Sequence, residues 1–359
     1  MKILVIQDHL RSGGTERQSV LLARAAAAAG HQSSLLTFRP GGALAAPDGV
    51  DRRSLQPFDL GLDWFAPGLF RSVRRIRPDV SVCMGRMANC YAGILQSRFP
   101  EMPVIATLRT GKPVPLLYRR SLRTVRHVVA NSREAGNLAV ARLSVPGDRI
   151  SVIANALVFP PGPPAARDPA IRARAGAGAG TFVMLCVAMF RPGKNQAELV
   201  EIAAGLPRGS DWQLWLAGEG SERARCERLA ASLGVAPRVK FLGYCADPSP
   251  LYAGADAAVL ASRSESLSNF LIEAQARGLP AVATEALGVS ECFLPGRTGW
   301  AVAPGDRGAF REALLRLMAE PAGRRSILAA EAAAFARAAF DPATQTAAYF
   351  GLFERLRSP

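Results

Sequence analysis

The chain has 359 residues, 49% of them hydrophobic and 20% charged, with a net charge of +15. This length suits two domains, and the composition excludes an intrinsically disordered chain. The six cysteines form no CxxC pair and there are three histidines, so neither a disulfide framework nor a zinc site is expected. The opening MKILVIQDHL predicts a first strand rather than a signal peptide, and no apolar run reaches membrane-spanning length. We therefore expect a cytoplasmic protein.

The net positive charge is concentrated in the first half of the chain, which carries +12 of the +15. Residues 1–165 hold 22 of the 44 Lys and Arg but only 10 of the 29 Asp and Glu. Such a field attracts an anionic partner, which could be a phospholipid, a nucleic acid or a phosphorylated substrate. Aromatic residues make up 7% of the chain, and no recognition motif is present, so nucleic-acid binding is the weakest of these interpretations.

Residues 1–160 alternate short apolar runs with helical patterns, beginning with a strand, an SGGTER loop and a helix over 16–30. The expected strands are 2–7, 33–38, 79–84, 103–108, 127–132 and 150–155. Strands spaced by helices predict a doubly wound parallel sheet with helices on both faces. We therefore expect a Rossmann-like N-terminal domain.

The segment 161–180 is rich in Pro, Gly and Ala, and it predicts a linker and the start of a second domain. A second series of strands is then expected over 182–190, 212–220, 238–244, 256–262, 280–284 and 299–304. A second Rossmann-like domain is expected over 181–340, and a helix over 341–359 that packs back on the first domain. Two α/β domains of this kind predict a central cleft, with the ligand at the carboxyl ends of the strands.

The segment SESLSNFLIEAQARGLPAVAT (264–284) places Glu265 and Glu273 around a helix start, before a buried strand. A helix start offers unpaired backbone amides to a diphosphate, and Ser266 or Ser268 is the expected N-cap. Carboxylates accept paired hydrogen bonds from the vicinal hydroxyls of sugars. The spacing therefore fits a nucleotide-sugar, although an isolated pair of this spacing is also common among surface glutamates.

At these residues the chain resembles the retaining glycosyltransferase family 4, of GT-B architecture, over nearly its whole length. The similar segments are SGGTER (12–17), WQLWLAGEG (212–220), RVKFLGY (238–244), GADAAVLAS (254–262), 264–284 and 288–306. The resemblance implies a retaining transfer from a nucleotide-diphosphate sugar, with a UDP- or GDP-sugar favoured. It also implies an acceptor-binding N-terminal domain, and a saccharide or lipid-linked acceptor in cell-surface polysaccharide synthesis.

Carried over by position, the resemblance assigns Glu265 to the transferred sugar and Glu273 to the nucleotide ribose. Lys194 and Arg191 would neutralise the leaving phosphate. The other donor-binding positions are Gly13 and Gly14 on the cleft floor, the backbone amides of Leu267, Ser268 and Asn269, and Tyr244 near the base. A bare Gly-Gly pair also forms simple turns.

The sequence departs from the family pattern at two positions. Met189 stands where the commonest pattern has its arginine, which leaves Arg191 as the candidate substitute. Arg109 stands where many relatives carry a catalytic-site histidine. An arginine cannot act as a general base, but it could bind an acidic acceptor or the oxygens of the reacting sugar. The chain has no D-x-D motif, so we expect no metal and no other cofactor.

Two basic segments of the first half, 71–77 and 118–126, contain clustered arginines. Leu116, Leu117, Tyr118 and Leu122 are interleaved with the second cluster. Such a surface could rest on anionic lipid at the cytoplasmic leaflet, or it could be a solvated basic helix. Two other functions remain open. One is a sugar-nucleotide epimerase of the same architecture, and the other is a catalytically inactive subunit that binds a nucleotide-sugar.

Overall fold

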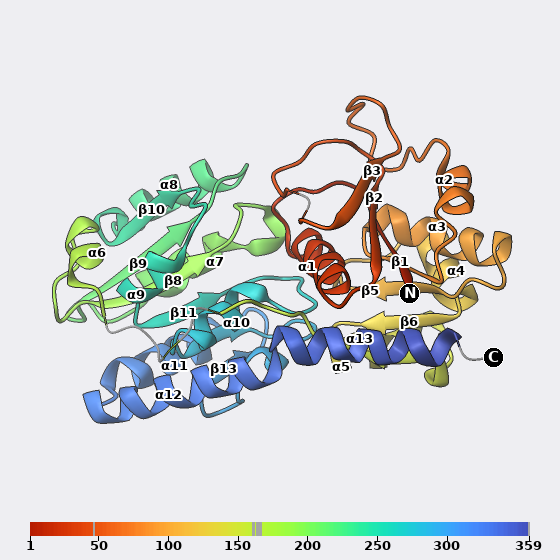
Figure 1. The fold of residues 1–359 in the computed structure, drawn as a ribbon. Helices are drawn as coiled ribbons and strands as arrows, with labels where there is room; N and C mark the ends of the chain where they lie inside the picture. Colours follow the sequence, from red (N-terminus) through yellow and green to blue (C-terminus); the bar gives the residue numbers. More distant parts are fainter. Residues whose placement is uncertain (46, 160–161, 163–166, 358–359) are drawn as a thin grey trace. The chain divides into compact units, whose positions relative to one another are not determined.

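The computed structural model describes residues 1–45, 47–159, 162 and 167–357 (Figure 1). The chain divides into a first unit, Met1–Ala156 with Pro342–Pro359, and a second unit, Leu157–Asp341. Each unit is built around one parallel sheet with flanking helices (Figure 1). The predicted fold class, two Rossmann-like doubly wound domains, is confirmed.

The described residues of the first unit form a sheet of seven parallel strands, in the order β3-β2-β1-β4-β5-β6-β7. The strands are β1 (Lys2–Gln7), β2 (Gln32–Thr37), β3 (Val50–Ser54), β4 (Val80–Cys83), β5 (Val104–Leu108), β6 (His127–Ala130) and β7 (Ile150–Val152). Its helices are α1 (Gly14–Ala28), α2 (Leu69–Ile76), α3 (Arg86–Arg98), α4 (Leu116–Thr124), α5 (Arg133–Leu143), the short η1 (Gly147–Arg149) and α13 (Pro342–Arg357).

The core of the first unit joins its sheet to helices from both ends of the chain. Apolar side chains of β1, β2, β4, β5 and β6 pack against Leu22 of α1 and against Tyr349, Leu352 and Phe353 of α13. All of these side chains are buried. The last helix of the sequence therefore completes the domain that the first strand begins.

The second unit has six parallel strands among its described residues, in the order β10-β9-β8-β11-β12-β13. The strands are β8 (Phe182–Val187), β9 (Trp212–Ala217), β10 (Val239–Gly243), β11 (Ala257–Leu260), β12 (Ala281–Thr284) and β13 (Gly299–Val302). The α-helices are α6 (Pro169–Arg174), α7 (Gln196–Ala204), α8 (Arg223–Ser232), α9 (Ser249–Gly254), α10 (Asn269–Ala276), α11 (Arg307–Ala319) and α12 (Ala322–Ala339). Single 3₁₀ turns are η2 (Pro192–Lys194), η3 (Ala236–Arg238) and η4 (Ser290–Cys292).

Both sheets reverse their strand order at one point, between β1 and β4 in the first unit and between β8 and β11 in the second. Loops that leave the carboxyl ends of two such strands run to opposite sides of the sheet and leave a crevice between them. The loops after β8 and β11 carry Lys194 and Glu265. The second sheet therefore places the two predicted site residues at its reversal point.

The structure contains one strand that was not expected, and a helix lies within the predicted linker. β3, with the sequence VDRRS, is an edge strand whose side chains are largely exposed. In the predicted linker, 161–180, residues 161 and 163–166 lie outside the described residues, and the later part contains α6. Asp168 caps α6 by accepting the amide of Ala170 at 2.8 Å. The boundary between the two units falls after Ala156.

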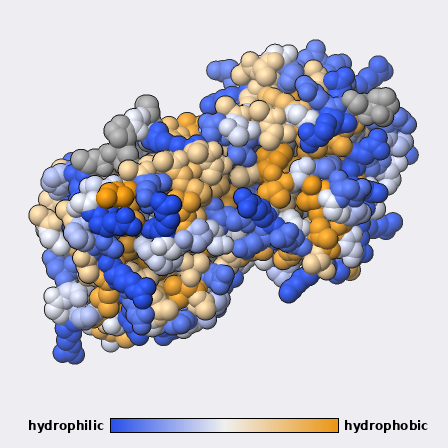
Figure 2. Space-filling model, turned by 90° about the horizontal axis from the view of Figure 1, so that it is seen from below, coloured by the Kyte–Doolittle hydropathy of each residue, from blue (hydrophilic) through white to orange (hydrophobic). Residues whose placement is uncertain are grey.

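Figure 2 shows hydrophilic and apolar side chains interspersed over the face seen from below. Among the described residues, no helix combines the length and the apolar character that crossing a membrane requires.

Candidate functional site

An ion pair joins the loops that follow β8 and β11. Lys194 Nζ lies 2.5 Å from Glu265 Oε1, with the lysine side chain 32% and the glutamate side chain 10% exposed. Because the two residues are 71 positions apart in sequence, only the adjacency of β8 and β11 brings them together. The structure thus places a cation and a carboxylate side by side at the carboxyl edge of the second sheet.

Two glycines hold the loop that precedes Lys194. Gly218 and Gly220 have φ values of 146° and 149°, a backbone region that other residues rarely adopt. A β-carbon at either position would also clash with a backbone oxygen, that of Ala188 or of Phe190 respectively. Phe190 N in turn donates to Glu219 O at 2.9 Å. These glycines therefore let the segment after β9 lie directly against the segment after β8 and fix its path.

Arg191 lies exposed in the same loop and contacts the methionine that replaces the family arginine. Its Nη2 lies 3.0 Å from Met189 Sδ. The Met189 side chain is itself 49% exposed. The guanidinium of Arg191 thus contacts Met189, the position where the resemblance led us to expect an arginine. Its predicted role at the leaving phosphate stays a prediction.

The start of α10 is as predicted in one respect and different in another. Ser268 is the N-cap, and its hydroxyl accepts the amide of Leu271 at 3.4 Å. The backbone amide of Ser268, however, donates to Cys292 Sγ at 3.3 Å. That amide is directed at a buried thiol in this structure, and its predicted role at a diphosphate stays a prediction. Leu267 is buried, and Asn269 is the first residue of the helix.

Glu273 lies one turn inside α10 and is held by a tyrosine that the sequence did not suggest. Tyr252 Oη donates to Glu273 Oε2 at 2.8 Å. The Tyr252 ring is buried, stacks on Phe270 with 6.1 Å between ring centroids, and carries the Arg277 guanidinium 4.6 Å from its own centroid. Burial and the neighbouring Glu273 carboxylate raise the pKa of Tyr252 well above its usual value. Tyr252 therefore remains a neutral hydrogen-bond donor to this carboxylate.

Tyr244 directly follows β10 and is 65% exposed. The loop that it occupies therefore offers an aromatic ring to solvent, as a contact to a nucleotide base requires.

In the first unit, Gly13 is the N-cap of α1 and Gly14 is its first residue. A β-carbon on Gly13 would clash with the carboxylate of Glu16, three residues further along the helix. The space beside Gly13 is thus occupied by a side chain of the same helix. The predicted place of Gly13 and Gly14 beneath a diphosphate stays a prediction.

A partly buried carboxylate that sequence analysis did not identify lies at the reversal point of the first sheet. Asp8 directly follows β1 and accepts the amides of Met87 and Ala88, at 2.9 and 2.7 Å, in the first turn of α3. A β-carbon at Gly85 would clash with the Asp8 carboxylate. Burial raises the pKa of Asp8 to about 6, although the two amide hydrogen bonds oppose the shift.

Arg109, predicted as a catalytic residue, is held by its own unit in this structure. Its Nη1 donates to Asn155 Oδ1 at 2.5 Å, and its Nη2 donates to Tyr349 Oη at 2.9 Å. Gln18 of α1 fixes the adjoining Ala156 through two hydrogen bonds, of 2.7 and 2.9 Å. These contacts connect the ends of β5 and β7 to α1 and α13, so Arg109 contributes to the architecture of the first unit.

Comparisons with known proteins cover both units. Residues 12–157 match the family model described as Glycosyltransferase Family 4, and residues 168–335 match the one described as Glycosyl transferases group 1. The lipopolysaccharide core biosynthesis glycosyltransferase LpsE of Rhizobium meliloti is 34% identical over 149 residues, which cover 42% of this chain and 43% of that protein. LpsD of the same organism is 32% identical over 206 residues, 57% of each chain. The matches thus span less than two thirds of these curated relatives.

Solved structures share the fold over the whole chain. Anabaena HepE, crystallised in complex with UDP, has a TM-score of 0.82 and 22% identity, and the match covers 99% of this chain and 100% of that one. Sucrose-phosphate synthase from Thermosynechococcus elongatus also has a TM-score of 0.82, with 19% identity and 99% of each chain covered. At sequence identities of 22% and 19%, the similarity to these structures shows a shared fold and nothing further.

Proposed function

This chain belongs to the glycosyltransferases of GT-B architecture, and from that membership we propose that it moves a sugar from a nucleotide-diphosphate sugar to an acceptor hydroxyl. The observation that carries the proposal is the Lys194–Glu265 ion pair at the carboxyl edge of the second sheet, with Glu273 on the helix α10 that follows Glu265. Lys194 supplies a cation for phosphate, and Glu265 and Glu273 supply carboxylates for sugar hydroxyls, so these residues have the chemistry that a donor site requires.

The proposed reaction breaks the bond between the anomeric carbon and the diphosphate oxygen and forms a bond from the anomeric carbon to the acceptor oxygen, through a transition state of oxocarbenium character. The proton of the acceptor hydroxyl passes to the leaving phosphate. Negative charge grows on the leaving diphosphate, and the Lys194 ammonium stabilises it, with Arg191 as an exposed second cation. Glu265 holds the hydroxyls of the sugar, and its 2.5 Å contact with Lys194 keeps both side chains in place. Most of the catalytic effect then comes from preorganised charge and positioning.

We propose a UDP-sugar as the first donor to test, with GDP-sugars next. Structures of Anabaena HepE with UDP and with UDP-glucose support this order. Retention of the anomeric configuration and independence from metal ions are further parts of the proposal. Proton NMR of the first-formed product tests retention, and turnover in excess EDTA tests metal independence.

For the acceptor, we propose a saccharide or a lipid-linked saccharide in surface-polysaccharide synthesis, which the names of LpsE and LpsD support. The start of α4 offers a membrane contact, because Leu116 and Leu117 are 83% and 55% exposed beside the exposed Arg120. Arg119 and Arg123 of the same helix instead donate to carbonyl groups of Arg142 and Leu143.

Cosedimentation with vesicles tests the proposed membrane contact at the start of α4. We expect binding to vesicles that contain phosphatidylglycerol, little binding to pure phosphatidylcholine, and a clear loss of binding in the double variant Leu116→Ser/Leu117→Ser. Equal binding of the double variant and the wild type would contradict it.

Thermal stabilisation by UDP-, GDP-, ADP- and dTDP-sugars tests the donor. Sugars of one nucleotide class should raise the melting temperature of the wild type by mass action. The same sugars should leave the melting temperature of Glu273→Ala unchanged. Stabilisation of both proteins alike would place the nucleotide elsewhere.

Turnover tests the chemistry and separates the alternatives. Lys194→Met should lower kcat by about 100-fold or more, as expected when a preorganised charge at a leaving group is removed. Lys112→Met, at an exposed lysine of the first unit, is the control and should retain full activity. Epimerised donor formed without acceptor would identify an epimerase, and donor binding without any turnover would identify a binding subunit.

A further inference from the structure

A cavity of about 560 Å³ lies in the second unit, at the edge of the sheet opposite Lys194 and Glu265. Its lining includes Phe182, which begins β8, and Asp256 and Pro280, which directly precede β11 and β12. The cavity is therefore at the amino ends of these strands, whereas Lys194 and Glu265 are at the carboxyl ends. Tyr252, whose hydroxyl binds Glu273, also lines the cavity. Its volume lies within the roughly 300–1,000 Å³ that is common for sites of small organic ligands.

Arginine side chains dominate the charge around this cavity. Asp256, which is buried, makes ion pairs with both Arg167 and Arg172, the second at 3.1 Å. Arg325 adds another guanidinium, for which the described part of the chain provides no hydrogen bond or ion pair. Burial lowers the pKa of Arg167, Asp256 opposes this effect, and the charges of Arg172 and Arg325 lower the pKa further. An anion between Arg167 and Arg325 would relieve this repulsion.

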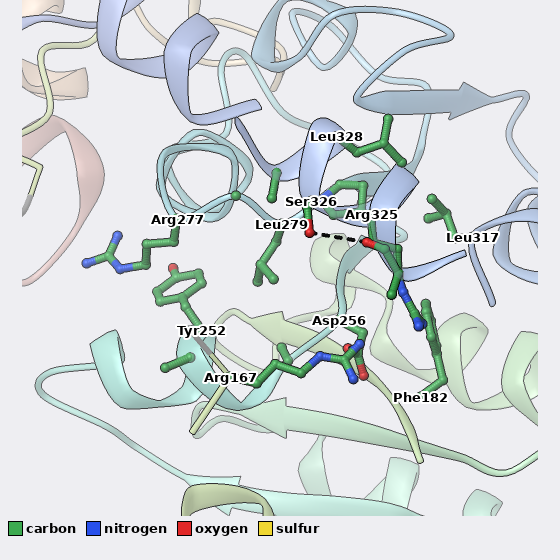
Figure 3. A pocket seen from close by; sticks show the side chains of 16 residues that line it. Arg167, Phe182, Tyr252, Asp256, Arg277, Leu279, Leu317, Arg325, Ser326 and Leu328 are labelled. Atoms are coloured by element: carbon green, nitrogen blue, oxygen red, sulfur yellow. Dashed lines mark hydrogen bonds and ion pairs between the residues drawn. The ribbon is translucent and has the colours of Figure 1, made fainter. Parts of the chain in front are cut away.

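The cavity also has an apolar wall. Figure 3 shows Arg167 extended toward Asp256 and the Arg325 side chain directed toward Phe182, with Arg277 and Tyr252 at the other end. The apolar side chains that line the space are Phe182, Leu279, Leu317 and Leu328. A ligand that filled this space would therefore need a charged end and an apolar body.

The first turn of α12 forms part of the lining, through Ala322, Arg325 and Ser326. Its N-cap is Pro321, which makes no capping hydrogen bond from its side chain. The start of this 18-residue helix carries partial positive charge, which adds to the field of the arginines.

We propose that this cavity is a second ligand site, which binds a small organic anion with a phosphate or carboxylate group attached to an apolar body. Arg167 and Arg325 hold the anionic group, since the guanidinium fork matches the paired oxygens of phosphate and carboxylate. The leucine and phenylalanine wall holds the apolar body.

Isothermal titration calorimetry of the full chain with phenyl phosphate tests the proposal, with inorganic phosphate and phenol as the two halves of that probe. Phenyl phosphate should bind about tenfold or more tightly than either half. Arg325→Gln should weaken its binding by about tenfold or more, because a charge-assisted hydrogen bond is lost. Arg324→Gln, at the exposed neighbouring arginine of the same helix, is the matched control and should bind as the wild type does.

Two further variants make the result decisive. Ser326→Phe adds a ring at the cavity wall and should abolish phenyl phosphate binding, with circular dichroism to verify folding. Lys194→Met should bind phenyl phosphate as the wild type does, because Lys194 is at the opposite edge of the sheet and does not line the cavity. The proposal is overturned if phenyl phosphate does not bind, if Arg324→Gln and Arg325→Gln weaken it equally, or if Lys194→Met abolishes binding. None of these outcomes depends on whether the chain transfers sugars.

Discussion

At the scale of single residues, the hydroxyl of Tyr252 fixes a carboxylate in the candidate donor site. Its bond to Glu273 is 2.8 Å long, and the guanidinium of Arg277 lies over the Tyr252 ring. If Glu273 binds the ribose, Tyr252 is a positioning residue for it. A carboxylate that must be reoriented before each binding event binds its ligand more weakly.

Tyr252→Phe tests this role, because it removes the hydroxyl and keeps the ring on Phe270. We expect the KM for donor to rise by about tenfold, the usual effect of losing one hydrogen bond to a charged group, with kcat changed much less. Tyr91→Phe removes a hydroxyl that donates to the carbonyl of Trp64 in the first unit, and it should leave KM unchanged. A fall in kcat with constant KM would show that Tyr252 acts in some other way.

Asp8 predicts a specific pH dependence of stability. Burial raises its pKa to about 6 in the folded chain, above its usual value of 3.8. The folded state therefore binds this proton more tightly than the unfolded state does. The resulting stabilisation is present below about pH 4 and is lost as the pH rises through 6.

The measurement compares wild type with Asp8→Asn by urea unfolding between pH 4 and 7. The free energy of unfolding of the wild type should fall by up to roughly 3 kcal/mol relative to the variant over this range. A constant difference between the two proteins would show that the carboxyl titrates at its ordinary pKa.

Sequence analysis identified those candidate site residues that belong to a local sequence motif. Glu265, Glu273 and Lys194 follow motifs, and the structure brings Lys194 and Glu265 into contact. Asp8 and Tyr252 were missed because their partners, the amides of α3 and a glutamate on another helix, are set by tertiary packing. The serine, leucine and asparagine at 266–269 predicted the helix start, but no local pattern signalled that the Ser268 amide would donate to Cys292.

At the scale of elements, the same reasoning explains β3. Its sequence, VDRRS, has no alternation of apolar and polar residues, and it was not predicted as a strand. It forms because β2 offers an unpaired edge and because an edge strand can leave its side chains in water. The buried strands, in contrast, are near-continuous apolar runs and were all predicted, with ends that differ by a few residues.

The cap of α10 gives a prediction at this scale. Ser268→Ala should lower the free energy of unfolding by about 1 kcal/mol, since it removes the side-chain acceptor for the Leu271 amide. Ser132→Ala is the matched control, because Ser132 caps α5 in the same way, accepting the amide of Ala135 at 3.1 Å. Both variants should lose similar stability in urea unfolding, but only Ser268→Ala should weaken donor binding. Equal donor affinity in both variants would separate the start of α10 from the donor site.

At the scale of the whole molecule, each unit has a core of its own. Phe353 of α13 is fully buried in the first unit, and Phe310 of α11 is 1% exposed in the second. Phe353→Ala should destabilise the first unit by roughly 3–5 kcal/mol, and Phe310→Ala should destabilise the second by a similar amount. Amide hydrogen exchange should show the loss of protection in one sheet at a time. Simultaneous loss in both sheets for either variant would mean that the units unfold as one.

The place of α13 in the first unit has a consequence for how the chain folds during synthesis. The second unit is an insertion, entered at Leu157 and left at Asp341, and the Leu157 amide donates to Phe340 O at 3.1 Å beside that boundary. On the ribosome, all of Leu157–Asp341 emerges before Tyr349, Leu352 and Phe353 can cover the first sheet. The unit that is translated first is therefore the last to complete its core. The apolar face of its sheet stays uncovered until α13 has been synthesised.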